Sequence, residues 1–259
     1  MHIQIEVTTK CNYECFYCAG RDLPQRHLDM ALFARILEEI PPGKHRISLQ
    51  GEGEPTMHPN FWEMVEAVIG LGHMPYTITN GSLMNPEKIA KYFPRIGISL
   101  DTVDPAEAQR IKRYKLDKML LKLDELLAVY EPHRIVIHTV DYGQDMIALK
   151  TYLETRGLTK HVIQPLQTKD DYAYLYRDRV AMPQKKEELT YSCTFLNKPI
   201  MQYYNLAGTR LPCCYIKDAS SFTSSEALLE DLNNKIVPAP CMGCSELKQG
   251  ASKSNIFLI

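Results

Sequence analysis

The sequence lacks an excess of charge of either sign, since 30 Lys and Arg residues stand against 31 Asp and Glu residues. A protein without a basic field has no general means of holding a polyanion, so nucleic acid is not an expected partner. No apolar run approaches the ~20 residues that span a bilayer, and a strand pattern begins at the N-terminus itself. We therefore expect neither a membrane span nor a signal peptide.

The chain also lacks internal repeats and low-complexity segments. Its 259 residues, 45% of them hydrophobic, can bury a full core, as one large domain or as one domain with an appendage. The eight cysteines are even in number, which a secreted disulfide framework would explain. Without a signal peptide, reduced thiols that bind metal in a cytosol are the better interpretation, and we expect a cytoplasmic protein.

Strands and helices alternate over the first two thirds of the chain. Apolar alternation predicts six strands, at residues 3–7, 47–49, 76–79, 96–100, 135–139 and 161–166. Helical spacing predicts five helices, at residues 30–40, 61–69, from about 85, 116–129 and 146–155. This alternation indicates an α/β fold of parallel units, and six units are too few to close an eightfold barrel. We predict an open, partial (β/α)6 barrel at residues 1–168, with its site at the carboxyl ends of the strands.

The remaining residues differ in character. Residues 169–189 are polar and aromatic, with Tyr172, Tyr174 and Tyr176, and we interpret them as a linker that contacts substrate. Residues 190–259 contain five cysteines, a hairpin pattern around residues 206–208 and a short helix at 227–232. They predict a small appendage held together by its cysteines.

Cys11, Cys15 and Cys18 form a CxxxCxxC loop at the end of the first predicted strand. Three thiols within eight residues can bind three irons of a [4Fe–4S] cube, which leaves one iron open for an outside ligand. Zinc is the alternative, although a structural zinc site usually takes four ligands from paired knuckles. The spacing alone leaves both metals open.

Because Tyr17 precedes the third cysteine, the loop resembles that of the radical S-adenosylmethionine (radical SAM) enzymes. Residues 51–55, GEGEP, resemble the GGEP element of that family, and residues 79–81 match its TNG. Residues 99–101 resemble its SLD element, although Thr102 replaces the glycine that usually follows. Each segment alone could be an ordinary turn or helix lead-in. Their order after the cysteine loop extends the resemblance over residues 3–166.

The resemblance implies that the open iron binds S-adenosylmethionine and that one electron cleaves it to a 5′-deoxyadenosyl radical, which abstracts a substrate hydrogen. An electron donor such as flavodoxin or ferredoxin would reduce the cluster. In this resemblance Glu54 lies beside the methionine ammonium, Tyr17 lies near the adenine, and Ser99 and Asp101 contact the carboxylate or ribose. The implied cofactor-binding residues are Tyr17, Gly53, Glu54, Thr79, Asn80, Ser99 and Asp101.

Four further cysteines, Cys193, Cys213, Cys241 and Cys244, are enough to saturate a second iron–sulfur cube. This segment resembles the Twitch fold, the short form of the SPASM auxiliary-cluster domain. The resemblance lies in a single cysteine, a hairpin ending in L-P-C and a final CxxC. A zinc ribbon is the alternative, and the neighbouring radical SAM motifs favour a [4Fe–4S] cluster. Since neighbours on a strand point to opposite faces, we expect Cys214 to be spare.

A radical SAM core with such an appendage resembles the alcohol-oxidising dehydrogenases of aminoglycoside biosynthesis, which act on deoxy-scyllo-inosamine. The resemblance implies removal of a carbinol hydrogen, loss of the hydroxyl proton to a base and transfer of an electron to the auxiliary cluster. His138, Gln167 and Lys169 are the candidates for the base. The alternatives are a ribosomal-peptide maturase, which epimerises or cross-links its substrate, and a non-catalytic zinc-binding scaffold.

Five basic residues between positions 110 and 118 form another candidate site. They could receive a phosphate or carboxylate, although a solvated helix face is the commoner explanation of such a stretch.

Overall fold

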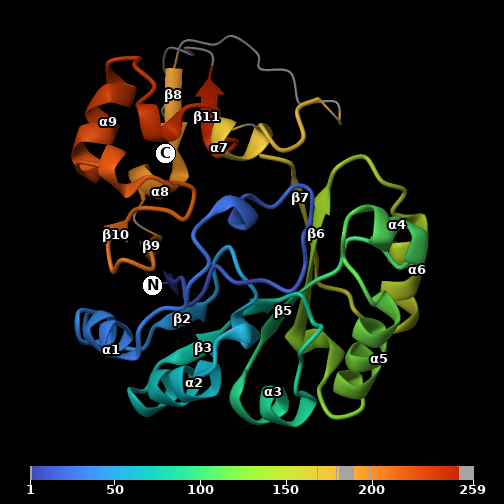
Figure 1. Ribbon diagram of the computed structural model, residues 1–259. Helices are drawn as coiled ribbons and strands as arrows, with labels where there is room; N and C mark the ends of the chain where they lie inside the picture. Colours follow the sequence, from blue (N-terminus) through green and yellow to red (C-terminus); the bar gives the residue numbers. More distant parts are fainter. Residues whose placement is uncertain (1, 168, 179, 181–189, 199, 251–259) are drawn as a thin grey trace, which may run out of the picture.

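Parallel strands in chain order form the centre of the computed structural model, which describes residues 2–167, 169–178, 180, 190–198 and 200–250 (Figure 1). All neighbours that pair along this series pair in parallel, and β3 and β4 are the two parts of one predicted strand. The six strand positions of the predicted (β/α)6 sheet are confirmed. The bounds are β1 (His2–Ile5), β2 (Arg46–Leu49), β3 (Met74–Tyr76), β4 (Ile78–Thr79), β5 (Ile96–Ser99), β6 (Ile135–Asp141) and β7 (His161–Pro165).

Thr77 separates β3 from β4 and joins the two halves of the sheet. Its buried hydroxyl donates to the carbonyl of Leu49 on β2 (2.7 Å). Its own carbonyl accepts from the backbone N–H of Gly97 on β5 (2.9 Å). The strand order therefore continues across the interruption.

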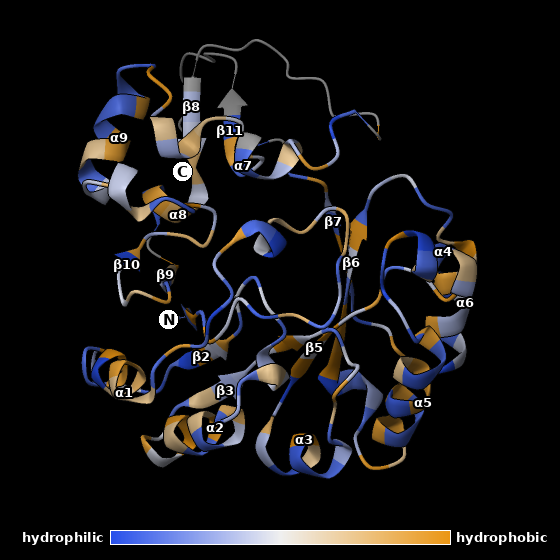
Figure 2. Ribbon diagram, viewed as in Figure 1, coloured by the Kyte–Doolittle hydropathy of each residue, from blue (hydrophilic) through white to orange (hydrophobic). Residues whose placement is uncertain are grey.

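The helices lie on the outer side of the arc of strands (Figure 1). They carry both apolar and polar residues, as expected for helices with one face on the sheet (Figure 2). No helix in the described ranges is long and apolar enough to cross a membrane. The five predicted helices are confirmed as α1 (Met30–Glu38), α2 (Phe61–Gly70), α3 (Pro86–Tyr92), α5 (Leu116–Leu127) and α6 (Ile147–Thr155).

Helix α4 (Pro105–Arg110) was not predicted, because it is too short to show a clear period. Its signal is local: Asp104 caps it by accepting from the N–H of Ala106 (2.8 Å), and Pro105 occupies its first turn. Short 3-10 turns are η1 (Ala19–Asp22), η2 (Pro55–Met57), η3 (Pro132–Arg134), η4 (Ala219–Ser221) and η5 (Ala239–Cys241).

The C-terminal segment contains the predicted hairpin and helix. Strands β9 and β10 pair antiparallel, and β8 pairs antiparallel with β11. The division into residues 1–168, 169–189 and 190–259 stays a prediction, and residues 168, 179, 181–189, 199 and 251–259 lie outside the described ones. The elements are α7 (Asp170–Ala173), β8 (Thr190–Cys193), α8 (Thr194–Asn197), β9 (Met201–Tyr204), β10 (Arg210–Leu211), α9 (Ser225–Asn233) and β11 (Leu247–Gly250).

The hairpin extends the sheet of the barrel. Strand β9 pairs parallel with β1, in a register that places Met201 opposite His2 and Tyr204 opposite Ile5. The resulting order is β10-β9-β1-β2-β3, so β1 is an interior strand although it begins the series. Part of the segment that we expected as an appendage therefore shares the barrel's sheet.

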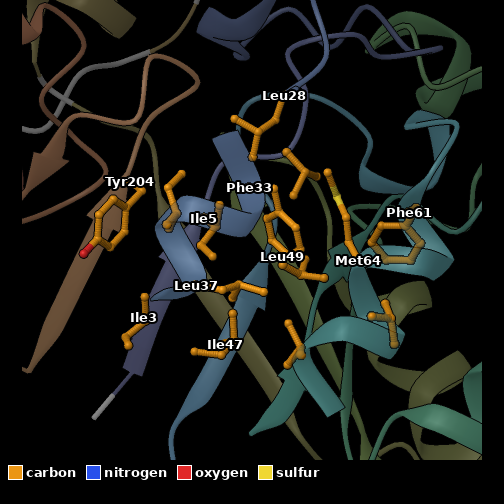
Figure 3. Packing of buried hydrophobic residues seen from close by; sticks show 14 of the residues in the cluster. Ile3, Ile5, Leu28, Phe33, Leu37, Ile47, Leu49, Phe61, Met64 and Tyr204 are labelled. Carbon is orange, nitrogen blue, oxygen red and sulfur yellow. The ribbon is translucent and has the colours of Figure 1, made fainter. Parts of the chain in front are cut away.

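Tyr204 shows this continuity in the core. Its side chain is fully buried and belongs to the same apolar cluster as Ile3 and Ile5 of β1 and Phe33 of α1 (Figure 3). The other main cluster lies between β5, β6 and helices α5 and α6. The N-terminal half of the barrel thus takes one of its largest core side chains from the C-terminal segment.

We predict that Tyr204→Ala destabilises the barrel and not only the hairpin. Removing a buried aromatic ring costs about 3–5 kcal/mol, whereas Tyr204→Phe keeps the ring and should cost about 1 kcal/mol or less. Urea unfolding followed by far-ultraviolet circular dichroism measures both. An alanine variant that unfolds at the wild-type urea concentration would contradict the shared core.

Candidate functional site

The three N-terminal thiols lie together at the carboxyl end of β1. Cys15 is buried and Cys11 and Cys18 are partly buried. All three line one cavity of about 470 Å³, which we call the three-thiol cavity. Its other walls are Thr9, Tyr13, Glu14, Gly20, Arg21, Asp22, Gln25 and Glu52.

The GEGEP loop packs against the cysteine loop and is hydrogen-bonded to it. Gly53 donates its N–H to the carbonyl of Thr8 (3.1 Å), and Glu54 donates its N–H to the carbonyl of Lys10 (2.9 Å). A Cβ atom at Gly53 would lie 2.4 Å from the Lys10 carbonyl oxygen, so only glycine fits. The backbone that leads into Cys11 is thereby fixed against this loop.

Glu54 joins the GEGEP loop to the end of β4. Its carboxylate is 2% exposed and accepts from the Thr79 hydroxyl (2.6 Å) and the Asn80 N–H (2.6 Å). Asn80 continues the network, because its amide donates to Asn12 Oδ1 (2.9 Å) and lies 3.8 Å from Cys11 Sγ. The predicted residues Gly53, Glu54, Thr79 and Asn80 are therefore assembled around the cysteine loop.

Asp101 lies at the end of β5 and is 1% exposed. One carboxylate oxygen accepts from the N–H of Val140 (2.7 Å), and the other accepts from the Tyr17 hydroxyl (2.5 Å). Arg113 pairs with the same carboxylate (3.0 Å) and donates to the carbonyl of Ser99 (2.7 Å). Ser99, Asp101 and Tyr17 thus form one group whose buried negative charge is compensated.

Sequence reasoning missed the special position of Arg113, which it treated as part of a basic stretch. Burial opposes the charge of Arg113, but Asp101, Tyr17 and Cys15 beside it raise its pKa well above the ordinary value. Arg110 and Lys112 point elsewhere and pair with Glu107 and Glu14. Arg110, Lys112 and Arg113 therefore do not share one anion site, and nothing in the sequence around Arg113 marked its charge as buried.

A second cavity, of about 200 Å³, opens beside Tyr17, and we call it the tyrosine cavity. Tyr17 stacks on Tyr142 at a centroid distance of 5.6 Å and meets Phe16 edge-on at 5.0 Å. Tyr17 lines this cavity and is not among the residues that line the three-thiol cavity. The lining residues are Tyr17, Val140, Gln164, Pro165, Leu166, Gln167, Tyr172, Tyr176, Tyr215, Ser245 and Glu246.

The three candidate bases have different surroundings. Burial lowers the pKa of His138 to about 4, and its Nε2 lies 3.2 Å from the Tyr76 hydroxyl. Lys169 is 3% exposed and its ammonium contacts the Tyr215 carbonyl (2.5 Å) and the Asp171 carboxylate (2.8 Å). Gln167, which does not titrate, lines the tyrosine cavity. A base works best with a pKa near the working pH, so the lowered pKa of His138 and the amide of Gln167 argue against both as the base.

The four C-terminal thiols also converge. Cys193, Cys213, Cys241 and Cys244 line one cavity of about 20 Å³, the four-thiol cavity, between apolar side chains such as Leu196. This donor set fits a thiolate-bound metal centre. A volume of this size holds about one water-sized sphere, so a four-iron cube requires the thiols to move outward. Within the described ranges, no three His, Cys, Asp or Glu side chains form a group arranged to hold one metal ion.

Cys214 was predicted to be spare because neighbours on a strand point to opposite faces, and the predicted strand at this position was wrong. Strand β10 ends at Leu211, and Cys213 and Cys214 lie in the turn that follows. The two thiols nevertheless differ, because Cys213 lines the four-thiol cavity and Cys214 is not among its lining residues. Burial raises the pKa of Cys213 to about 12, and the nearby thiols of Cys244, Cys193 and Cys241 add to the rise.

Comparison with known proteins agrees with this arrangement. Residues 5–154 match a family model described as Radical SAM superfamily. A tungsten-containing aldehyde ferredoxin oxidoreductase cofactor-modifying protein of Pyrococcus furiosus is 33% identical over 190 residues, 64% of this chain and 51% of that protein. An S-adenosylmethionine-dependent nucleotide dehydratase of Thermoplasmatales archaeon (strain ISO4-H5) is 33% identical over 115 residues, 42% of this chain and 41% of that protein. The chain spans about half the length of these curated relatives or less.

The fold is also similar to that of solved structures. Streptococcus suis SuiB bound to S-adenosylmethionine superimposes with a TM-score of 0.64 and 16% identity, over 93% of this chain and 66% of SuiB. At this identity the likeness concerns the fold alone, and it confirms the predicted α/β fold with a parallel sheet and outer helices.

We predict that Gly53→Ala displaces the cysteine loop and reduces the iron bound after anaerobic reconstitution by about four atoms per chain, the content of one cube. The matched control is Gly70→Ala at the end of α2, where an added Cβ meets no atom within 4 Å. Iron analysis with circular dichroism measures both variants. Wild-type iron content in Gly53→Ala would show that the close approach does not hold the loop.

Proposed function

Because the chain belongs to the radical SAM superfamily, we propose that Cys11, Cys15 and Cys18 hold a [4Fe–4S] cluster at which S-adenosylmethionine binds. When bound, this pair of cofactors supplies the 5′-deoxyadenosyl radical that removes a hydrogen atom from the substrate. The observation that carries the proposal is that all three thiols line one cavity at the carboxyl end of β1. This is the end of a parallel barrel at which sites are built.

The chain's own residues would position and tune this centre. The N–H of Tyr13 donates to Cys11 Sγ (3.4 Å), and the Asn80 amide approaches the same sulfur (3.8 Å). Hydrogen bonds to the cysteine sulfurs raise the reduction potential of a cluster by stabilising its negative charge. The Arg113 guanidinium beside Cys15 adds a fixed positive charge on another side.

We also propose that Cys193, Cys213, Cys241 and Cys244 hold an auxiliary [4Fe–4S] cluster in a Twitch-type segment. The support is that these four thiols line one cavity with apolar walls, which limit access of water. Zinc with four thiolates is the rival occupant, and metal analysis separates the two. A cluster with four thiolate ligands has no vacancy for a substrate, which favours a role in accepting electrons.

The reaction that we propose is oxidation of an alcohol of a small, amino-sugar-like metabolite to a carbonyl. One hydrogen atom leaves the carbinol carbon for the 5′-deoxyadenosyl radical, and the hydroxyl proton leaves to a base. The remaining electron passes to the auxiliary cluster, and flavodoxin or ferredoxin supplies the electron that starts each cycle. The tyrosine cavity supports this sequence of steps, because its lining includes Tyr17 of the cysteine loop and Ser245, the residue after Cys244. A substrate in this cavity would therefore lie beside segments that carry both groups of thiols.

A peptide substrate is the second candidate. Strand β7 ends the four-stranded part of the sheet, and its Val162 and Ile163 are 40% and 42% exposed. An edge strand that has no further partner among the described residues can pair with an extended peptide. Maturation of a ribosomal peptide would then replace oxidation of a metabolite.

We predict that the reduced, anaerobically reconstituted chain cleaves S-adenosylmethionine to methionine and 5′-deoxyadenosine. Replacing Cys11, Cys15 and Cys18 together by Ala should abolish cleavage, because these thiolates are the cluster's protein ligands. Liquid chromatography of the products measures both proteins. Cleavage at the wild-type rate by the triple variant would end the proposal, as would no cleavage by a wild-type chain containing iron.

Alanine variants of the adjacent residues Cys213 and Cys214 form a matched pair that tests the proposed auxiliary cluster. Cys213→Ala should lower the iron content from about eight to about four atoms per chain, because it removes one of four ligands. Cys214→Ala should keep about eight, since it changes only packing. Iron and zinc analysis with Mössbauer spectroscopy measures both. Stoichiometric zinc lost only in Cys213→Ala would identify a zinc site instead, and loss of the metal only in Cys214→Ala would reassign the ligand.

A further inference from the structure

Lys217 of the C-terminal segment is largely buried against the GEGEP loop of the barrel. Its ammonium group forms an ion pair with the carboxylate of Glu52, and the two side chains are 12% and 16% exposed. The ammonium lies 4.9 Å from the centre of the Tyr172 ring, whose hydroxyl donates to the same oxygen of Glu52 (3.1 Å). Glu52 therefore receives charged and neutral donors from two segments that follow the barrel in the chain.

Glu52 connects this ion pair to the cysteine loop. It lines the three-thiol cavity, and it also lines a neighbouring cavity of about 170 Å³ that Lys217 lines from the other side. The Glu52 carbonyl lies 3.7 Å from Cys18 Sγ, and a Cβ atom at Gly20 would lie 2.7 Å from Glu52 Cβ. Because residue 52 packs directly on the cysteine loop, whatever fixes its side chain also fixes a wall of the three-thiol cavity.

The charges in the neighbouring cavity make Lys217 necessary. Glu6 is 6% exposed, lines this cavity beside Glu52 and accepts from the N–H of Glu52 (3.1 Å). Arg26 is the other cation of the lining, and it is exposed. Burial lowers the pKa of Lys217 to about 8, and Glu6 and Cys18 act against this decrease, so Lys217 is charged at pH 7. Its loss would leave carboxylates buried without an ammonium partner, which is strongly destabilising.

Lys217 is also an electrostatic neighbour of the cysteine loop. Burial raises the pKa of Cys18 to about 11, and Lys217 is one of the groups that act against this rise. Arg113 has the corresponding position beside Cys15. The cysteine loop therefore has two largely buried cations beside it, one from the barrel and one from the C-terminal segment.

We propose that Lys217 is a positioning residue of the three-thiol cavity, which fixes Glu52 beside Cys18 and compensates the charge of Glu52 there. A residue of the C-terminal segment thereby completes a site whose cysteines belong to the barrel. The effect on a cluster rests on the proposed function. The effect on Glu52 does not, because it involves only side chains of the chain itself.

The two partners should act on a cluster in opposite directions. Accepting one electron makes a four-iron cluster at Cys11, Cys15 and Cys18 more negative, so nearby positive charge favours reduction and nearby negative charge opposes it. A unit charge about 10 Å away changes such an equilibrium about tenfold at an effective permittivity of about 20. Tenfold corresponds to about 59 mV for one electron. A contact that only supports the fold would not produce shifts of opposite sign.

The experiment measures the midpoint potential of the anaerobically reconstituted chain at pH 7 by titration with dithionite. Electron paramagnetic resonance follows the signal that changes when S-adenosylmethionine is added, which identifies the cluster at the open site. Lys217→Met should lower this potential by about 59 mV, and Glu52→Gln should raise it by about as much. The double variant should lie near the wild type. The matched control is Lys198→Met, which removes an exposed lysine from the same segment and should leave the potential unchanged.

Several outcomes of this titration would overturn the proposal. They are single shifts of equal sign, no shift in either single variant, a double variant shifted as far as the single ones, and a shift in Lys198→Met as large as that in Lys217→Met. If Lys217→Met retains no iron, the double variant decides. Its iron content should recover, because it no longer contains an unpaired buried carboxylate, and no recovery would contradict the proposal.

Urea unfolding separates this inference from the proposed function. The effects of Lys217→Met and Glu52→Gln on the unfolding constant should be non-additive, with a coupling of about tenfold in the double variant. A chain with this coupling but without a signal that S-adenosylmethionine changes retains the positioning of Glu52 and loses the proposed cluster. Additive effects in the same chain would overturn the inference as well.

Discussion

Strand β1 is hydrogen-bonded on both sides, and both groups of cysteines depend on this double pairing. On one side β2 leads into the GEGEP loop that supports the cysteine loop, and on the other side β9 brings in the C-terminal hairpin. A strand paired on both sides has no free edge along which its register could slip. The loop that carries Cys11 therefore starts from one of the most constrained strands of the molecule.

Close packing around the cysteine loop replaces the support that a regular element would give. Gly53 leaves no room for a Cβ atom against the Lys10 carbonyl, and Gly20 would place one 2.6 Å from the Glu52 carbonyl. Buried charges in this region are compensated: Glu54 accepts four hydrogen bonds, two from Thr56 and two from the end of β4, and Asp101 faces Arg113. Unpaired, each would cost several kcal/mol, so the motifs stabilise the loop geometry as well as offering contacts to a cofactor.

The sequence allowed the strands and most helices to be predicted because their apolar periods are local. It did not reveal the pairing of β9 with β1, since the two partners are about 200 residues apart and no local pattern encodes such a contact. Helix α4 was not predicted from the sequence, because only an N-terminal cap and a proline indicate this short helix. The turn at Cys213 was taken for strand because Leu211 and Pro212 continue the alternation of β10.

The candidate site was predictable to the same extent. Cysteine spacing and three short motifs identified two groups of residues, and the structure brings each group together. The buried position of Arg113 was not predicted, because nothing in its sequence neighbours distinguishes a buried charge from a solvated one. It follows from the convergence of distant segments, which also produces the tyrosine cavity.

The transfer of a carbinol hydrogen is the most direct test of the central claim that the chain oxidises an alcohol with S-adenosylmethionine as co-oxidant. A candidate amino-sugar-like alcohol, deuterated at its carbinol carbons, is incubated with the reduced enzyme, and mass spectrometry follows the label. The account predicts one deuterium in 5′-deoxyadenosine and one S-adenosylmethionine consumed for each carbonyl formed. Deuterium returning to the product while S-adenosylmethionine is regenerated would contradict it and indicate a redox-neutral reaction.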